Sequence, residues 1–249
     1  MGTLVACDLN RQRIISFNSD DLSYIAQAQD DPYEFAPSGL CNDGTNLFLS
    51  EAYHFNNITK RDISDLSTIT SGVGELGSGD YGLQYPQGIA QDGTHLFIAD
   101  QDNGRILKWT VDLVYVGEIA DEGAIFYENP FIPMAVAVDD EFIYVVDRGS
   151  HRIIKRDKNT LAFVLEAGAG GIFGSGHGEF SNPYDICAEG GLLYVADQGN
   201  LRIQILNSSD LSYVGEITNL GGINIDFGVI TGIASDGTYL YVSVGYLFG

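Results

Sequence analysis

The sequence has 249 residues, of which 45% are apolar, and a formal charge of −22 from 12 basic and 34 acidic side chains. This apolar content is sufficient for a buried core and excludes a disordered or fibrous chain. The negative charge argues against nucleic acid as a partner, because affinity for a phosphate backbone comes mainly from Lys and Arg. It also opposes attachment to anionic lipid.

Membrane insertion and a disulfide framework are not expected either. No apolar run reaches the length of a membrane-spanning helix. The three cysteines, Cys7, Cys41 and Cys187, are too few for a framework and fall within predicted strands, so we expect buried, inert thiols. No signal peptide opens the sequence, and "MGT" leads almost directly into a strand, which favours a mature or excised segment.

Three short β-prone segments follow one another at the start of the chain. The first, "LVACD", ends at Asp8, the second opens with Arg13-Ile14, and the third is "LSYIAQ" from Leu22. Branched and aromatic residues in runs this short are typical of strands. We name these segments strands b, c and d, because in later units a further strand, a, precedes b.

The same order of strands then recurs along the chain, with 43 to 50 residues between the ends of successive b strands. Strand a begins at Pro37, Pro86, Pro133, Pro183 and Ile230. Strand b ends at Asp8, Glu51, Asp100, Asp147, Asp197 and Val244. Strand c opens with Arg-Ile at Arg13, Arg105, Arg152 and Arg202, and with Asn57-Ile58 in the second unit. The repeat units span about residues 1–29, 37–71, 86–120, 133–167, 183–218 and 230–249.

The junctions between strands a and b support a hairpin architecture. They read Asp-Gly-Thr at Asp43, Asp92 and Asp236, and Asp-Gly suits a tight hairpin turn. Four-stranded antiparallel units repeating roughly every 40–50 residues predict an all-β fold, a β-propeller. We therefore expect residues 1–249 to form a single propeller domain.

Several repeated phrases resemble those of the NHL-repeat family. They are "PQGIAQDG" from Pro86, "LYVAD" ending at Asp197, "DQGNLRI" and the lead-in "GSGHGEFSNP" from Gly174, and the likeness covers nearly the whole chain. The resemblance implies a propeller that serves as a protein- or RNA-binding platform, or less often as an enzyme. The charge of this chain disfavours the RNA-binding role.

The number of blades depends on how the ends of the chain combine. The N-terminal unit supplies strands b, c and d, and the C-terminal unit supplies strand a from Ile230. If that strand completes the N-terminal blade, the propeller has five blades, which we favour; six blades are the alternative. With five blades the apolar segment from Tyr239 to Gly249 is left over. Unpaired strands associate readily, so we expect assembly through Tyr239, Tyr241, Val242, Tyr246, Leu247 and Phe248.

The recurring acids at the ends of strand b have two interpretations. They could form a ring of carboxylates that binds a cation, or each could pair with the Arg of its own strand c. We favour the structural pair, because function seldom needs the same pair in every repeat. Glu51 has no Arg at the matching place and is therefore the acid that we expect to be most available.

The loops between strands b and c and between strands d and a are expected on one face of the propeller, where a scaffold usually carries its binding residues. We expect a contact surface formed by Tyr53, His54, Phe55, Tyr81, Phe126, Tyr127, Phe173 and His177. These side chains would also suit a carbohydrate or a peptide, which is a further alternative. A metal-dependent hydrolase or lyase remains a second alternative, with Ca²⁺ or another divalent cation held by Glu51, His54 and His177.

The sequence thus predicts a non-catalytic, acidic NHL-type propeller without a cofactor. We expect an extracellular or cell-surface location, and proteins as partners, including other copies of the chain.

Overall fold

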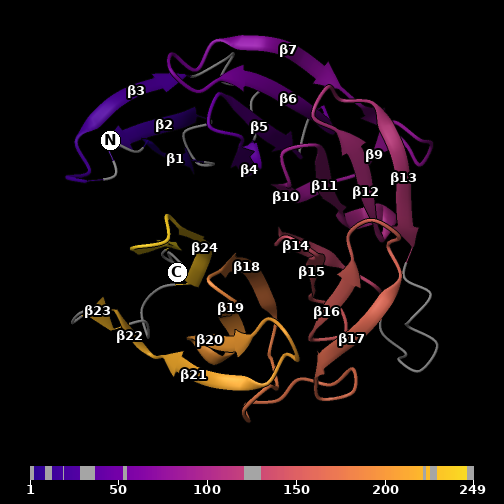
Figure 1. Cartoon of the computed structure of the whole chain (residues 1–249), viewed down its shortest axis with the longest axis vertical. Coiled ribbons are helices and arrows are strands. Elements are labelled where there is room, and N and C mark those ends of the chain that lie inside the picture. The colour runs from indigo at the N-terminus through magenta and orange to yellow at the C-terminus, as the bar shows by residue number, and fades with distance from the viewer. Residues whose placement is uncertain are drawn as a thin grey trace. The chain divides into compact units, whose positions relative to one another are not determined.

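The computed structural model describes residues 3–8, 13–18, 20–28, 37–52, 55–120, 130–220, 223–224 and 229–245. The chain divides into two compact units, Met1–Glu118 and Ile119–Gly249, which are described in turn. Both consist of β-sheet (Figure 1). The helices among the described residues are two 3₁₀ turns, Gln101–Asn103 and Gln198–Asn200, and none is long or apolar enough to cross a membrane.

The first unit contains one three-stranded sheet and two four-stranded sheets, with the strands of each sheet in chain order. The N-terminal sheet has strands b, c and d, as predicted. A short parallel pair, β8 and β9, precedes the third sheet. The strands are β1 (Thr3–Asp8), β2 (Arg13–Asn18), β3 (Tyr24–Ala28), β4 (Pro37–Asn42), β5 (Asn46–Glu51), β6 (Asn57–Asp62), β7 (Thr68–Val73), β8 (Glu75–Leu76), β9 (Gly82–Leu83), β10 (Pro86–Gln91), β11 (His95–Asp100), β12 (Arg105–Thr110) and β13 (Tyr115–Ala120).

The second unit contains two four-stranded sheets and ends in a two-stranded hairpin. Together the units provide the four complete four-stranded sheets that the repeats predict. A further short pair, β22 and β23, precedes the hairpin. The strands are β14 (Pro133–Val138), β15 (Phe142–Asp147), β16 (Arg152–Asp157), β17 (Phe163–Gly168), β18 (Pro183–Glu189), β19 (Leu192–Asp197), β20 (Arg202–Asn207), β21 (Tyr213–Ile217), β22 (Asn219–Leu220), β23 (Ile223–Asn224), β24 (Val229–Ser235) and β25 (Leu240–Gly245).

The a–b turns form as predicted. In each turn the aspartate carboxylate accepts hydrogen bonds from backbone N–H groups of the residues that follow it. The Asp92 carboxylate accepts hydrogen bonds from the N–H groups of Thr94 at 2.9 Å and His95 at 2.7 Å. Asp43 and Asp236 accept the corresponding pair in their own turns. The following Gly93 has a φ of 87°, which glycine adopts without steric cost.

The c–d turns differ from the prediction, which placed the first leucine inside strand d. Leu22, Leu66, Leu113, Leu161 and Leu211 have φ between 56° and 64°, in the left-handed region. Each donates its N–H to a carbonyl three or four residues earlier, for example Leu211 to Asn207 at 2.8 Å. Strand d therefore begins two residues later in the chain. Burial of Leu66, Leu113 and Leu211 in the core offsets the conformational cost.

The core lies between neighbouring sheets, and two lysines of strand c add polar links there. Lys60 Nζ donates to the carbonyl of Val111 at 3.2 Å. Lys155 Nζ donates to the carbonyls of Ser208 and Ser209 at 2.8 Å each. Strand b is largely buried in the complete sheets; β11 and β15, for instance, are buried at every position but the first.

Candidate functional site

The recurring acids and arginines pair within three sheets. Arg Nε donates to the Asp Oδ2 at 2.8 Å in Asp100–Arg105, Asp147–Arg152 and Asp197–Arg202. All three aspartates are fully buried. The structure therefore supports the pairing interpretation for these acids, because a carboxylate that is occupied by a buried guanidinium is poorly available to a cation.

A glutamate of strand d completes each of these pairs. The Arg Nη1 donates to Glu118 at 2.5 Å, to Glu166 at 2.7 Å and to Glu216 at 2.9 Å. The acid, the Arg and the glutamate thus connect strands b, c and d of one sheet. Sequence reasoning missed these glutamates, although a glutamate follows the aromatic of strand d by three residues in each of these sheets.

The same guanidinium groups also hold the loops that lead into strand a. Arg202 Nη2 donates to the carbonyls of Gly176 at 2.9 Å and Glu179 at 3.0 Å. Asn200 Nδ2 donates to the carbonyl of Gly174 at 2.8 Å. Arg105 contacts three carbonyls of the corresponding loop in the first unit, those of Ser78, Gly79 and Gly82, at 2.7–3.0 Å. These loops are therefore anchored to the sheets at several points.

The second sheet departs from this arrangement, as its sequence predicts. Glu51 is not the available carboxylate that we expected: only 6% of its surface is exposed, and it accepts a hydrogen bond from the Thr59 hydroxyl. His54, the second residue of the alternative metal set, lies outside the described residues. Among the residues described, no group of three or more His, Cys, Asp or Glu side chains is placed to hold a metal ion.

The predicted contact residues fall into two groups in the structure. Phe173 is exposed over 73% of its surface next to the exposed Ile172, and its ring meets that of His151 edge-on at 6.2 Å. His177 stacks on Tyr213, with ring centroids 3.9 Å apart. In the first unit, Phe55 and Tyr81 are exposed, and the Tyr81 ring lies 5.6 Å from that of the buried Trp109. Tyr53, Phe126 and Tyr127 lie outside the described residues.

His151 has a structural partner. Its Nδ1 accepts a hydrogen bond from the N–H of Asn182 at 3.0 Å, so this imidazole links the turn after β15 to the start of β18. Burial lowers the pKa of His151, which favours the neutral form that can accept this bond.

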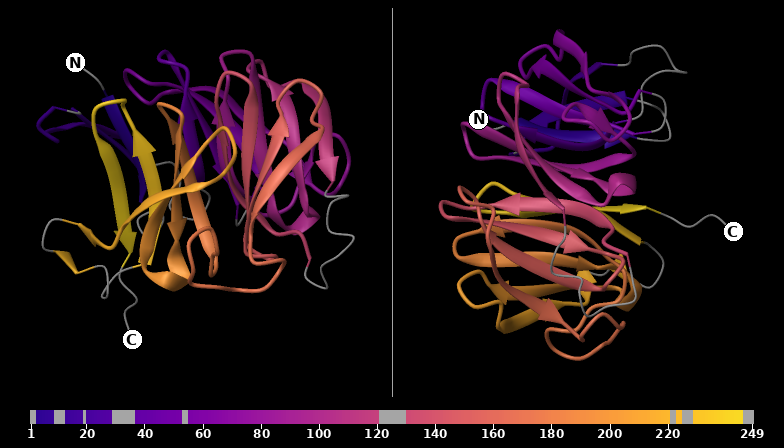
Figure 2. Two further views of the ribbon diagram at one scale, coloured as in Figure 1. Left: turned by 60° about the horizontal axis from the view of Figure 1, so that its bottom comes forward. Right: turned by 90° about the vertical axis from the view of Figure 1, so that its right-hand side faces the viewer.

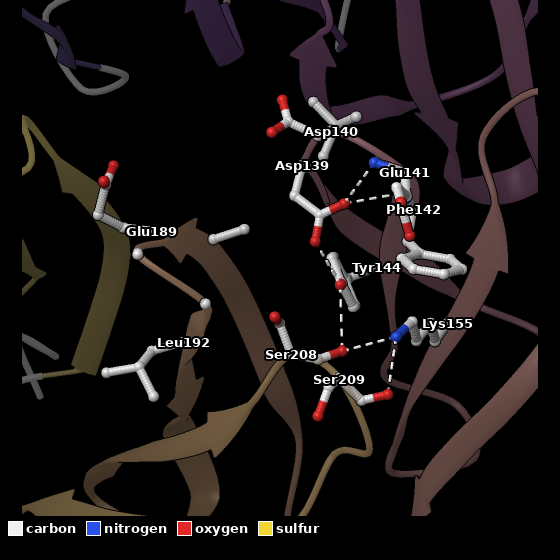
Figure 3. A pocket seen from close by; sticks show the side chains of 14 residues that line it. Asp139, Asp140, Glu141, Phe142, Tyr144, Lys155, Glu189, Leu192, Ser208 and Ser209 are labelled. Atoms are coloured by element: carbon white, nitrogen blue, oxygen red, sulfur yellow. Dashed lines mark hydrogen bonds between the residues drawn. The ribbon is translucent and has the colours of Figure 1, made fainter.

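A cavity of about 600 Å³ in the second unit was not predicted (Figure 3). It lies between the turns after β14 and β18, and its rim is acidic, with Asp140, Glu141 and Glu189. Lys155 is the cation in its lining, and its amine is occupied by two carbonyls and lies 3.8 Å from the Phe142 ring centre. Burial lowers the pKa of Lys155. The cavity is thus closed on one side by the hydrogen bonds from Lys155 to Ser208 and Ser209, which join the sheets β14–β17 and β18–β21.

One carboxylate of an inner strand contacts the C-terminal hairpin. Asp185 stands where strands β4, β10, β14 and β24 carry Gly or Ala, and it accepts the N–H of Ile233 in β24 at 2.7 Å. Burial raises the pKa of Asp185 to about 6, against the opposing effect of hydrogen bonds from Ile233 and Ile186. Gln198, which follows β19, also contacts the hairpin and donates to the carbonyl of Ile230 at 3.2 Å.

The C-terminal segment, which the five-blade count leaves over, forms a strand of its own. Leu240–Gly245 forms β25, which pairs antiparallel with β24 and appears as part of the yellow pair in Figure 2. Of the predicted assembly residues, Tyr239 is 63% exposed, the Tyr241 hydroxyl donates to Asp236 at 2.8 Å, and Val242 packs on the cluster around Ile233. Tyr246, Leu247 and Phe248 lie outside the described residues. The predicted completion of the N-terminal sheet by β24 stays a prediction.

The cysteines match the expectation of inert thiols. Cys7, Cys41 and Cys187 form no disulfide with one another and are partly buried. Burial raises the pKa of Cys7 to about 12 and that of Cys187 to about 11, and it raises that of Cys41 as well. Thiols with such raised values are weak nucleophiles at neutral pH.

Neither a protein-family model nor a curated protein matches the chain in sequence. Among solved structures, a chain of the nidogen/laminin complex is similar with a TM-score of 0.61 at 15% identity, covering 86% of this chain and 78% of that one. Glutaminyl cyclase of Myxococcus xanthus is similar with a TM-score of 0.56 at 13% identity, covering 84% and 85%. The fold is a β-propeller. The predicted all-β class with five blades is confirmed, the N-terminal sheet being one of the five.

At these identities the propeller likeness establishes the fold alone. The two neighbours differ in kind, since one belongs to a protein–protein complex and the other is an enzyme. Propellers host unrelated functions on one scaffold, so the function of this chain has to be argued from its own side chains.

Proposed function

We propose that this chain is a non-catalytic propeller of the NHL type that works as a binding and self-assembly module outside the cell or on its surface. Its partners are proteins, among them other copies of the chain. The observation that carries the proposal is the C-terminal hairpin: residues 237–245 contain no Asp, Glu, Lys, Arg or His in a chain of charge −22, and Tyr239 is exposed there.

The use of the polar residues supports a role without catalysis. The buried acids and arginines that recur in the repeats are engaged in joining strands and holding loops. The anchored loop of the second unit exposes two apolar side chains, Ile172 and Phe173. Exposed aromatics on rigid supports are typical of protein interfaces, because little conformational entropy is lost on binding.

The charge of the chain supports proteins as its partners, in preference to nucleic acid or an anionic membrane. A chain with 34 acidic and 12 basic side chains disfavours nucleic acid and anionic membrane as partners. Like charges also repel between copies, so self-association needs an uncharged contact, and the hairpin offers one.

A pair of tyrosine variants tests the assembly role. Tyr239→Ser removes the exposed ring from the hairpin, and Tyr24→Ser removes a ring of similar exposure, 60%, from β3. Light scattering after size-exclusion chromatography should show a smaller average mass for Tyr239→Ser than for the unmodified chain, and no change for Tyr24→Ser. Equal effects of both variants, or a monomeric unmodified chain, would contradict the proposal.

A further inference from the structure

We infer that the outer edge of β25 is the assembly contact and that its occupant is β25 of a second copy, paired antiparallel about a two-fold axis. The inference rests on the proposed self-assembly and specifies the backbone groups that make it. The pairing would use the N–H and C=O groups of Leu240, Val242 and Val244.

The register of the hairpin identifies β25 as a strand b. Ile230 pairs with Val244 and Ile233 with Val242, which matches the pairing of Pro183 with Asp197 and Ile186 with Val195 in the preceding sheet. In that sheet strand b is bonded on both edges, to β18 and β20. In the described part of the chain, the sheet of β25 has only two strands.

The direction of the backbone groups follows from the turn. The N–H of Asp236 donates to the carbonyl of Tyr239 at 3.3 Å. The backbone N–H and C=O groups of Tyr239 and of every second residue after it therefore point toward β24. The N–H and C=O groups of Leu240, Val242 and Val244 consequently point to the other edge. A row of such groups is a template for an added strand.

The side chains of β25 are less buried than those of β19, the strand b of the preceding sheet. In β19 four of the six residues are buried, whereas in β25 none is. The hairpin is nevertheless held in place, because Leu240 and Val242 pack on the cluster of Ile203, Ile230 and Ile233, and Asp185 accepts the N–H of Ile233. A strand that is already held in position loses little entropy when a partner adds to it.

The composition of β25 favours a second copy as the partner. Exposed edge strands are normally protected by charged residues or proline, and residues 237–245 have neither. A two-fold axis brings identical residues together, so two copies of a charged edge would repel each other. The edge of β25 carries no charged side chain, although the chain has a net charge of −22. Antiparallel pairing about such an axis gives a closed dimer.

Amide hydrogen exchange of the unmodified 249-residue chain tests the inference. Over about a thousandfold range of concentration, the amides of Leu240, Val242 and Val244 should become protected as the mass doubles, while those of β19 stay protected throughout. Assembly without protection of these three amides would overturn the inference and leave the proposed function standing. Their protection in the dilute monomer would also overturn it, because the edge would then be covered within one chain. A chain that stays monomeric over the whole range of concentration would contradict both the inference and the proposed self-assembly.

A proline variant provides the matched test. Val244→Pro removes an N–H from the outer edge, and Ser243→Ala in the same strand leaves every N–H in place. The dimer dissociation constant should rise at least about tenfold for Val244→Pro and stay unchanged for Ser243→Ala. An unchanged constant for both variants would refute the inference. If Val244→Pro opens the hairpin itself, seen as fast exchange of the Tyr241 amide, the exchange experiment on the unmodified chain decides.

Discussion

The sheet β18–β21 and the hairpin β24–β25 start from the same a–b register and end in different environments. In the sheet, strand b ends in Asp197, which pairs with Arg202, and strands c and d cover it. In the hairpin, strand b has Val244 at that position, and no strand c or d is found among the described residues. A strand b is therefore buried by the strands and the guanidinium beside it, and without them it remains an edge.

Breaking the buried pair of the complete sheet should have the largest effect. Arg202→Met leaves Asp197 buried without its guanidinium and releases the loop at Gly176, which should lower the free energy of unfolding by about 3–5 kcal/mol. Denaturant unfolding followed by circular dichroism measures the change. Adding Asp197→Asn to this variant should recover part of the loss, because the uncompensated charge is then gone; a double variant as unstable as the sum of both would contradict the account.

A substitution in the c–d turn, which the hairpin lacks, should have the next largest effect on stability. Leu211→Gly relieves the left-handed backbone at a gain of about 1 kcal/mol but empties a buried site at a cost of about 2–4 kcal/mol, so it should destabilise. Leu22 has the same backbone conformation and is 57% exposed, so Leu22→Gly should be neutral or stabilising by up to about 1 kcal/mol. Thermal melts should show a lower melting temperature for Leu211→Gly and an unchanged or higher one for Leu22→Gly.

The contact between the complete sheet and the hairpin should show a pH dependence at Asp185. Its pKa of about 6 lies above the ordinary 3.8, so the folded state favours the protonated form and loses stability as pH rises between these values. Asp185→Asn should therefore stabilise the chain at pH 8, on the order of 1 kcal/mol, with little difference near pH 4. The control is Asp210→Asn, because hydrogen bonds to Ser212 lower the pKa of that exposed turn residue and its loss should not stabilise at pH 8. A constant difference across pH would contradict the assignment.

Divalent cations should have the smallest effect. Because Glu51 bonds to Thr59, and Asp100, Asp147 and Asp197 bond to arginines, millimolar Ca²⁺ or Zn²⁺ should leave the melting temperature unchanged. A concentration-dependent rise in the melting temperature would revive the metal-dependent alternative.

The repeat made the sheets predictable from sequence, whereas the details depended on contacts across the fold. Asp-Gly at the a–b turns and Arg-Ile after the acidic end of strand b are local signals, and the structure contains the turns and the pairs that they predict. The left-handed leucines were missed because a leucine beside a strand pattern normally belongs to the strand. Glu51 was misjudged because its partner, Thr59, lies on the next strand and carries no charge. The role of Lys155 depends on carbonyls 53 and 54 residues away, which no local pattern reveals.

The mass of the unmodified chain as a function of concentration, from sedimentation velocity, tests the central claim most directly. If the uncharged hairpin edge pairs between copies, the mass should rise from 26.9 kDa at low concentration to a plateau at twice that value. A mass that stays at the monomer value over the whole range, or that keeps growing past the dimer, would contradict the pairing.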